Sequence, residues 1–191
     1  MNLILLLVIV FLIGLIIFLY SPKKDEPALK AGDKAPDFKL PDENERKRSL
    51  SEFKGSKVVL YFYPKDNTPG CTIQACAIRD TYRLFRENDV VIIGINYDSP
   101  ALHKAFKARY QLPFILLSDE EKKIAKKYGA YISILNNLYP ERKTFLIDEK
   151  GHIMKIVENV DIATHTNDLL VALGLEHNQQ ENTPSDPKSD D

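Results

Sequence analysis

The sequence predicts an α/β domain with a central sheet flanked by helices, preceded by one membrane-spanning helix. Three observations lead to this class. Strand-like apolar runs alternate with amphipathic helical patterns between residues 32 and 175. Residues 3–20 form one uncharged apolar stretch. Both cysteines lie near the start of one helical pattern that directly follows a strand-like run.

The strands are predicted from short runs of β-branched and aromatic residues that end at turn residues. The clearest run, at 57–63, contains Val, Leu, Tyr and Phe and is followed by a proline, which is typical of a buried strand. The other strands are expected at 35–40, 90–95, 114–117, 144–147 and 153–157. An Asp-Glu-Lys-Gly turn separates the last two and predicts a hairpin.

Helices are predicted where apolar residues recur every three or four positions and capping residues stand at the ends. Their ranges are 69–86, 100–110, 118–129 and 162–173. Ser118 to Glu121 predicts a capping box, and Gly129 and Gly174 predict helix ends. The order of strand, helix, strand, helix, hairpin and final helix indicates a thioredoxin-like α/β sandwich.

The apolar stretch at 3–20 is long enough to cross a hydrocarbon layer of about 30 Å as a helix. A cleaved signal peptide is the alternative, but no Lys or Arg precedes the stretch and no small-residue cleavage site follows it. We therefore expect an uncleaved membrane anchor. Lys23 and Lys24 follow the stretch and favour a cytoplasmic position for the remainder of the chain.

The composition divides the chain into four parts. Residues 1–20 are the expected anchor, 21–31 a polar tether interrupted by prolines, and 32–175 the globular domain. Residues 176–191 carry five acids against one lysine and no aliphatic residue, so we expect a disordered acidic tail. The formal net charge of −1 argues against a nucleic-acid partner. We expect a monomeric domain.

The segment around the two cysteines predicts an activated thiol. Thr68 is a favourable N-cap, and Pro69 is tolerated as the first helical residue. Cys71 therefore falls in the first helical turn, where unpaired N–H groups and the helix dipole stabilise an anion. The pKa of its thiol should lie below the usual value of about 8.5.

Cys76 lies five residues after Cys71. In an intact helix the two Cα atoms would be about 8–9 Å apart. A disulfide requires less than about 7 Å. If the two cysteines pair, the start of the helix must therefore unwind first, and this arrangement indicates redox chemistry.

The same segment resembles the peroxiredoxins of the bacterioferritin comigratory (Q-type) class. The resemblance is carried by the run Tyr-Phe-Tyr-Pro-Lys-Asp-Asn-Thr-Pro-Gly-Cys-Thr at 61–72, by Cys76, and by Arg79-Asp80. It extends through the motifs at 112–119, Tyr128-Gly129 and the run at 142–148, and it covers roughly residues 32–175.

The resemblance implies thiol-dependent reduction of hydrogen peroxide and organic hydroperoxides. Cys71 matches the cysteine that attacks peroxide and becomes a sulfenic acid, and Cys76 matches the cysteine that then forms an intramolecular disulfide. Thr68 and Arg142 match residues that hold the peroxide and stabilise the thiolate, and Pro64 matches a residue that shields it. Thioredoxin or a similar thiol reductant is the implied partner, and no cofactor is implied.

Three departures from the family pattern stand out. Gln74 occupies a position where the family usually has Glu, so a neutral amide that can still accept a hydrogen bond from arginine replaces a charge. The segment 130–141 is also shorter than its counterpart. The predicted anchor at 3–20 is an addition that the common soluble members lack.

Other readings of the cysteines remain open from the residues alone. A membrane-tethered thiol–disulfide oxidoreductase would act on protein disulfides, but such proteins usually present Cys-x-x-Cys. A copper-carrying assembly factor would need Cys-x3-Cys and a distal histidine. A structural disulfide or a pair of inert core thiols is the simplest alternative. No metal site is expected, because the histidines lack paired spacing and are expected in turns or on the surface; they are His103, His152, His165 and His177.

Overall fold

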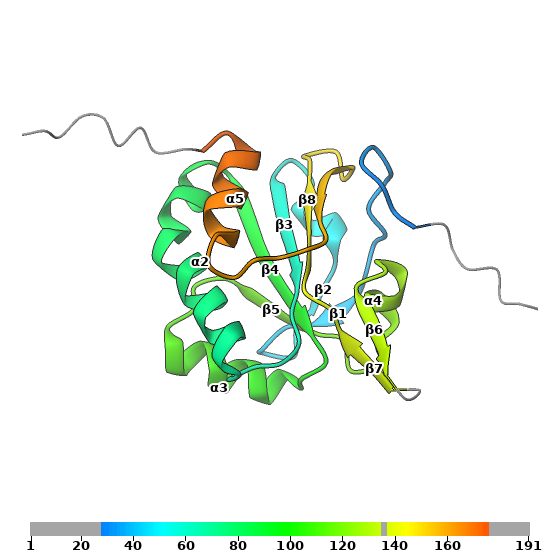
Figure 1. The fold of residues 1–191 in the computed structure, drawn as a ribbon, viewed down its shortest axis with the longest axis vertical. Helices are drawn as coiled ribbons and strands as arrows, with labels where there is room; N and C mark the ends of the chain where they lie inside the picture. Colours follow the sequence, from blue (N-terminus) through cyan, green and yellow to red (C-terminus); the bar gives the residue numbers. More distant parts are fainter. Residues whose placement is uncertain (1–27, 135–136, 176–191) are drawn as a thin grey trace, which may run out of the picture.

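The computed structural model describes residues 28–134 and 137–175 (Figure 1). The strands are β1 (Leu40–Pro41), β2 (Lys47–Arg48), β3 (Lys57–Phe62), β4 (Val90–Asn96), β5 (Ile115–Ser118), β6 (Tyr131–Ile134), β7 (Asn137–Pro140), β8 (Lys143–Ile147) and β9 (Ile153–Val157). The helices are α2 (Pro69–Glu87), α3 (Pro100–Tyr110), α4 (Lys123–Lys127) and α5 (His165–Leu173), with a 3₁₀ turn, η1, at Leu50–Phe53.

The central sheet has the strand order β5-β4-β3-β8-β9. Strands β3, β4 and β5 run parallel, as expected of strands joined by the crossover helices α2 and α3. Strand β8 is antiparallel to β3 and forms the predicted hairpin with β9. This mixed sheet, covered by helices on both faces, confirms the predicted thioredoxin-like architecture.

Alternation along β3 supplies both halves of the core. Val59 and Tyr61 pack on one face against residues of α2, α3 and α5, including Ile78 and Leu169. Figure 1 shows these helices together on one side of the sheet. Val58, Leu60 and Phe62 face the other side, where they pack with α4 and the segment that leads into β1. Because both faces are covered, β3 is apolar throughout, as its sequence predicted.

Three predicted elements differ from the structure. The edge strand expected at 35–40 is reduced to Leu40–Pro41, which pairs with Lys47–Arg48. The helix expected at 118–129 begins only at Lys123, because Ser118 remains in β5 and the carboxylate of Asp119 accepts hydrogen bonds from the backbone N–H groups of residues 123–125. The last helix begins at His165 rather than 162.

A short hairpin, β6–β7, was not predicted. Its strands pair antiparallel, with Tyr131 opposite Pro140. Tyr131, Ile132 and Tyr139 are exposed on it. The hairpin lies next to α4 and away from the central sheet (Figure 1). Since it contributes little apolar surface to the core, its periodicity was too weak to identify.

Two predictions fall outside the described residues. The membrane anchor at 3–20, with most of the tether at 21–31, is one of them, and the acidic tail at 176–191 is the other. Within the part of the chain that the structure describes, no helix combines the length and apolar character needed to cross a membrane.

Candidate active site around Cys71

Cys71 lies where the sequence predicts it, in the first turn of α2. Thr68 is the N-cap residue, with extended backbone angles, and Pro69 is the first helical residue. Six residues separate the end of β3 from the start of the helix, so Cys71 lies beyond the carboxyl end of a central strand. Its side chain is only 2% exposed. The thiol is therefore enclosed at the start of α2, in the core cluster that also contains Tyr61 and Leu169.

Thr68 caps the helix with its backbone rather than with its side chain. Its carbonyl accepts the N–H of Thr72 at 2.9 Å, which begins the helical hydrogen bonding. Its hydroxyl donates to the carbonyl of Lys65 at 3.0 Å, and no side-chain cap is formed. The neighbouring Asn67 has a left-handed φ of 57°, a conformation that Asn tolerates. Thr68 thus tightens the loop that leads to Cys71.

Arg142, the residue directly before β8, contacts Cys71 through its guanidinium. Its Nη2 lies 3.1 Å from Cys71 Sγ, and its Nη1 donates to Gln74 Oε1 at 2.6 Å. Gln74 lies one helical turn after Cys71, so the two side chains project from the same face of α2. A guanidinium at this distance favours the thiolate and would also stabilise negative charge on a bound oxygen.

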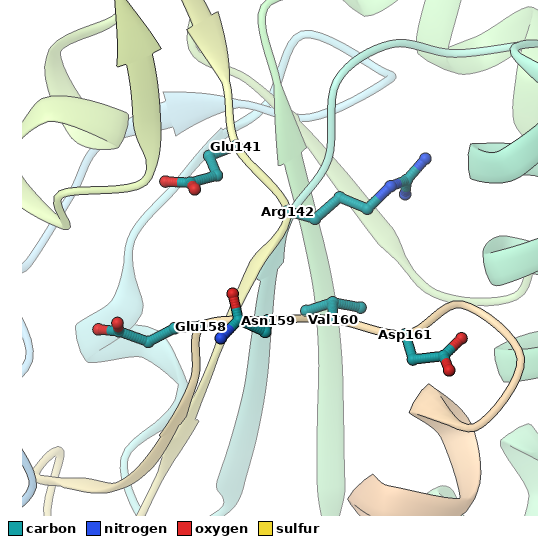
Figure 2. Close-up of a pocket in the computed structure, with 6 residues that line it drawn as sticks. All are labelled: Glu141, Arg142, Glu158, Asn159, Val160 and Asp161. Carbon is teal, nitrogen blue, oxygen red and sulfur yellow. The ribbon is translucent and has the colours of Figure 1, made fainter.

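The position of Arg142 follows from the pairing of two strands. Lys143 in β8 lies opposite Phe62 in β3, so the residue before β8 lies beside the end of β3. Figure 2 shows the Arg142 side chain extending away from Glu141, toward α2. Sequence alone supported this role only through the family resemblance, since Arg142 stands between two charged residues.

An acidic hollow borders the backbone side of Arg142 (Figure 2). It is lined by Glu141, Glu158, Asn159, Val160 and Asp161 together with Arg142. Glu158 is paired with Lys143 at 3.0 Å. The carboxylates of the hollow lie on the backbone side of Arg142, whereas its guanidinium lies on the Cys71 side.

Gly70 permits the close approach of Arg142 to α2. A Cβ added at this position would lie 2.9 Å from Ile162 Cδ1 and 3.1 Å from Arg142 Nη2. The backbone of Gly70 is otherwise helical, so the requirement is for space and not for an unusual φ. The glycine in the motif therefore leaves room for the guanidinium.

The remaining predicted site residues are Cys76 and Pro64. Cys76 is half-buried on α2, and both cysteines are free. Because α2 is continuous from Pro69 to Glu87, helix geometry separates their Cα atoms by about 8–9 Å. Pro64 is exposed in the turn after β3. Among the residues described, no group of three metal-ligating side chains is gathered in one place.

The expectation that the histidines lie in turns or on the surface is wrong for two of them. His165 is 1% exposed, and it joins Gln74 to Thr144 through its two ring nitrogens, each at 3.0 Å. Its spacing with Leu169 and Leu173 places it on the apolar face of α5, a signal that was present in the sequence. Burial and the nearby Arg142 lower the pKa of His165 to about 4, despite the opposing effect of Asp168.

The second buried histidine is part of a polar cluster beneath the Cys71 loop. His103 is fully buried, and its Nδ1 lies 2.8 Å from Asp66 Oδ2. The other oxygen of Asp66 accepts hydrogen bonds from the Tyr63 hydroxyl at 2.7 Å and the Asn96 amide at 3.0 Å. The cluster ties the loop to β4 and α3. Helical spacing with Phe106 could have indicated the burial of His103.

Comparisons with known proteins agree on one family. Residues 31–156 match the model of the AhpC/TSA family. The chloroplastic peroxiredoxin Q of Populus jackii is 48% identical over 128 residues, which cover 67% of this chain and 60% of the relative. The peroxiredoxin Bcp of Bacillus subtilis is 42% identical over 149 residues, covering 76% of this chain and 95% of the relative. The chain thus spans about 60% of the length of the plant relatives that it matches.

Solved structures lead to the same group. Peroxidoxin BcpB of Mycobacterium tuberculosis superposes with a TM-score of 0.72 at 33% identity, over 76% of this chain and 97% of the other. The bacterioferritin comigratory protein of Xanthomonas campestris superposes with a TM-score of 0.70 at 27% identity, over 76% and 98%. The fold, the environment of the cysteine and these similarities agree, and the chain therefore belongs to the AhpC/TSA family, in its peroxiredoxin Q/Bcp group.

Proposed function

We propose that this protein is a thiol-dependent peroxidase that reduces hydrogen peroxide and organic hydroperoxides at Cys71. The observation that carries the proposal is the position of Cys71 Sγ, in the first turn of α2 and 3.1 Å from Arg142 Nη2. Membership of the peroxiredoxin Q/Bcp group supports the same activity. A buried sulfur that is stabilised as an anion is the nucleophile that this reaction requires.

In the first step the Cys71 thiolate attacks one peroxide oxygen. A sulfur–oxygen bond forms, the oxygen–oxygen bond breaks, and the departing alkoxide or hydroxide takes a proton to leave as alcohol or water. Cys71 becomes a sulfenic acid, oxidised by two electrons while the peroxide is reduced. Arg142 stabilises the thiolate and the charge that develops on the departing oxygen.

In the second step the thiolate of Cys76 attacks Cys71 Sγ, the sulfur–oxygen bond breaks, and the departing hydroxide takes a proton to leave as water as the disulfide forms. The intact helix holds the two Cα atoms too far apart for a disulfide, so the start of α2 must open between the steps. A dithiol reductant, thioredoxin or a similar protein, then supplies two electrons and restores both thiols.

We assign supporting roles to two further residues. Thr68 holds the loop through its hydrogen bond to Lys65, and its position before Cys71 makes it a candidate contact for the peroxide. Pro64 is proposed to shield the thiol from bulk water, as its counterpart in the resemblance implies. Neither role requires a metal or a bound cofactor.

The test compares the full chain with Cys71→Ser and Cys76→Ser. The unaltered protein should consume peroxide continuously with thioredoxin, whereas Cys71→Ser should consume none. Cys76→Ser should react once, at an unchanged first-turnover rate, and then stop. Undiminished peroxide consumption by Cys71→Ser contradicts the proposal. Reduction of insulin disulfides without any peroxidase activity identifies instead an oxidoreductase of protein disulfides.

The organisation of the whole chain remains part of the proposal. We propose an anchor at 1–20, a tether at 21–31, a monomeric catalytic domain at 32–175 facing the cytoplasm, and an acidic tail at 176–191. Sodium carbonate extraction of membranes checks the anchor, because a spanning helix keeps the protein in the membrane fraction. Labelling of Cys76 by an impermeant thiol reagent in intact cells checks the side.

A further inference from the structure

Behind Arg142 three buried side chains form a continuous chain of hydrogen bonds. Gln74 and His165 are each 1% exposed and Thr144 is fully buried. Gln74 accepts from Arg142 Nη1 at 2.6 Å, and its amide nitrogen lies 3.0 Å from His165 Nδ1. His165 Nε2 lies 3.0 Å from the hydroxyl of Thr144. The chain thus links the N-terminus of α5 to the guanidinium that contacts Cys71.

The chemistry of the groups fixes the direction of every bond. Arginine can only donate, so the atom of Gln74 that faces Arg142 must be its oxygen. The Gln74 amide nitrogen then donates to His165 Nδ1, which must be an unprotonated acceptor. A neutral ring with no proton on Nδ1 carries it on Nε2 and donates it to Thr144. His165 is therefore held as a single neutral tautomer.

An imidazolium would break this chain. A proton on Nδ1 would meet the NH2 group of Gln74, and relief by rotation of the amide would turn that NH2 group toward Arg142. Of the charged groups near the ring, Arg142 opposes protonation and Asp168 favours it, while burial opposes it. The neutral state is thus favoured by the surroundings as well as by the hydrogen bonds.

We propose that His165 is a positioning residue for the peroxidase reaction: as the neutral Nε2–H tautomer, it orients the Gln74 amide so that its oxygen holds Arg142 against Cys71. The inference rests on the proposed function of Cys71. His165 touches neither Cys71 nor the peroxide, and it acts through Gln74 and Arg142. Gln74 and neutral His165 form a matched pair, because Gln74 supplies the donor that a deprotonated Nδ1 needs.

Two substitutions of His165 separate the two ring contacts. The side-chain oxygen of asparagine corresponds to Nδ1, so His165→Asn retains an acceptor for Gln74 and loses the Thr144 contact. The terminal amide of glutamine corresponds to Nε2, so His165→Gln retains Thr144 and loses the acceptor. We expect His165→Gln to slow the reaction of Cys71 with peroxide about tenfold and His165→Asn at most about threefold, the difference being one hydrogen bond to a group that holds a charge. Equal rates in the two variants overturn the inference.

The rate of alkylation of Cys71 by iodoacetamide, measured in the Cys76→Ser background, should follow the same order. This measurement requires no peroxidase activity. If the protein consumes no peroxide but the alkylation rates still differ as expected, the proposed function fails, and only the positioning of Arg142 against Cys71 by His165 is supported. If peroxide turnover is normal and the two variants alkylate at one rate, the inference fails alone.

The tautomer itself is observable without any change to His165. Long-range proton–nitrogen NMR spectra of the reduced full chain at neutral pH should show the proton of His165 on Nε2, and a proton on Nδ1 overturns the inference. In Gln74→Glu a carboxylate faces Nδ1, so the ring should gain a proton there. An unchanged His165 spectrum in that variant also overturns it. These spectra keep the inference testable even if a His165 variant does not fold.

Discussion

Arg142 donates a hydrogen bond to Cys71 Sγ over 3.1 Å, although 71 positions separate the two residues in the chain. The contact exists because β8 pairs with β3 and the helix that carries Cys71 follows β3. The planar guanidinium directs one nitrogen to Cys71 and the other to Gln74 in a fixed geometry, so the identity of residue 142 matters as well as its charge.

Substitution of Arg142 should therefore slow the first chemical step. We expect Arg142→Met to reduce the rate of Cys71 oxidation about a hundredfold, the scale of losing one donor to a developing oxyanion. Arg142→Lys keeps the positive charge but lacks the forked guanidinium, so its rate of Cys71 oxidation should lie between those of the unaltered protein and Arg142→Met. Stopped-flow peroxide reduction measures the rate. Arg83→Met is the matched control, because Arg83 is exposed on α2, the helix that carries Cys71; this variant should react at the unaltered rate.

Gly70→Ala should impair activity more than stability. The new Cβ would crowd Arg142 Nη2 and Ile162 Cδ1, whereas alanine is well accepted in a helix. We expect about a tenfold slower oxidation of Cys71, together with a change of less than about 1 kcal/mol in the free energy of unfolding. The double variant Gly70→Ala, Ile162→Val removes the apolar clash alone. Full recovery of the rate in it would show that crowding of Arg142 is not the cause.

Asp66 should contribute to the stability of the Cys71 loop. Its carboxylate holds Tyr63, Asn96 and His103, and Asp66→Ala would leave these buried groups without their partner. We expect a loss of about 3 kcal/mol in the free energy of unfolding, the scale of breaking a buried polar network. Urea unfolding followed by circular dichroism measures it. Asp80→Ala removes an exposed carboxylate and should change stability by less than about 1 kcal/mol.

His165 should make the protein less stable in mild acid. Its pKa is about 4 in the folded protein, against 6.5 for an unperturbed ring, so between these values the unfolded chain binds the additional proton. The free energy of unfolding should fall as the pH falls from 6.5 to 4, by about 3 kcal/mol from this group.

The difference between the unaltered protein and His165→Asn isolates this effect, since other titrating groups are common to both. Urea unfolding at several pH values measures the difference, which should be largest near neutral pH and shrink toward pH 4. His152→Asn, at a half-exposed position, serves as the control. A difference that does not change with pH would contradict the assignment.

Local signals in the amino-acid sequence specify the elements that carry the thiol. The continuous apolar run of β3 indicates a strand buried on both faces, and Thr68-Pro69 marks the start of α2, because burial pattern along a strand and the preference of proline for the first helical turn are local properties. The position of Cys71 in the first turn follows from these local signals alone. The short helix α4 shows the limit of these local signals. Asp119 accepts hydrogen bonds at the start of α4, although the helix begins four residues after it.

The surroundings of the sulfur depend on contacts between distant segments of the chain. The contact of Arg142 with Cys71 depends on the register between β3 and β8, and the contact of Gln74 with His165 depends on how α5 packs on α2. Neither residue pair is close in sequence, so no local period or motif specifies the distance between them. The neighbouring chain positions the thiol, whereas folding brings Arg142 to Cys71 from 71 positions away and His165 to Gln74 from 91 positions away.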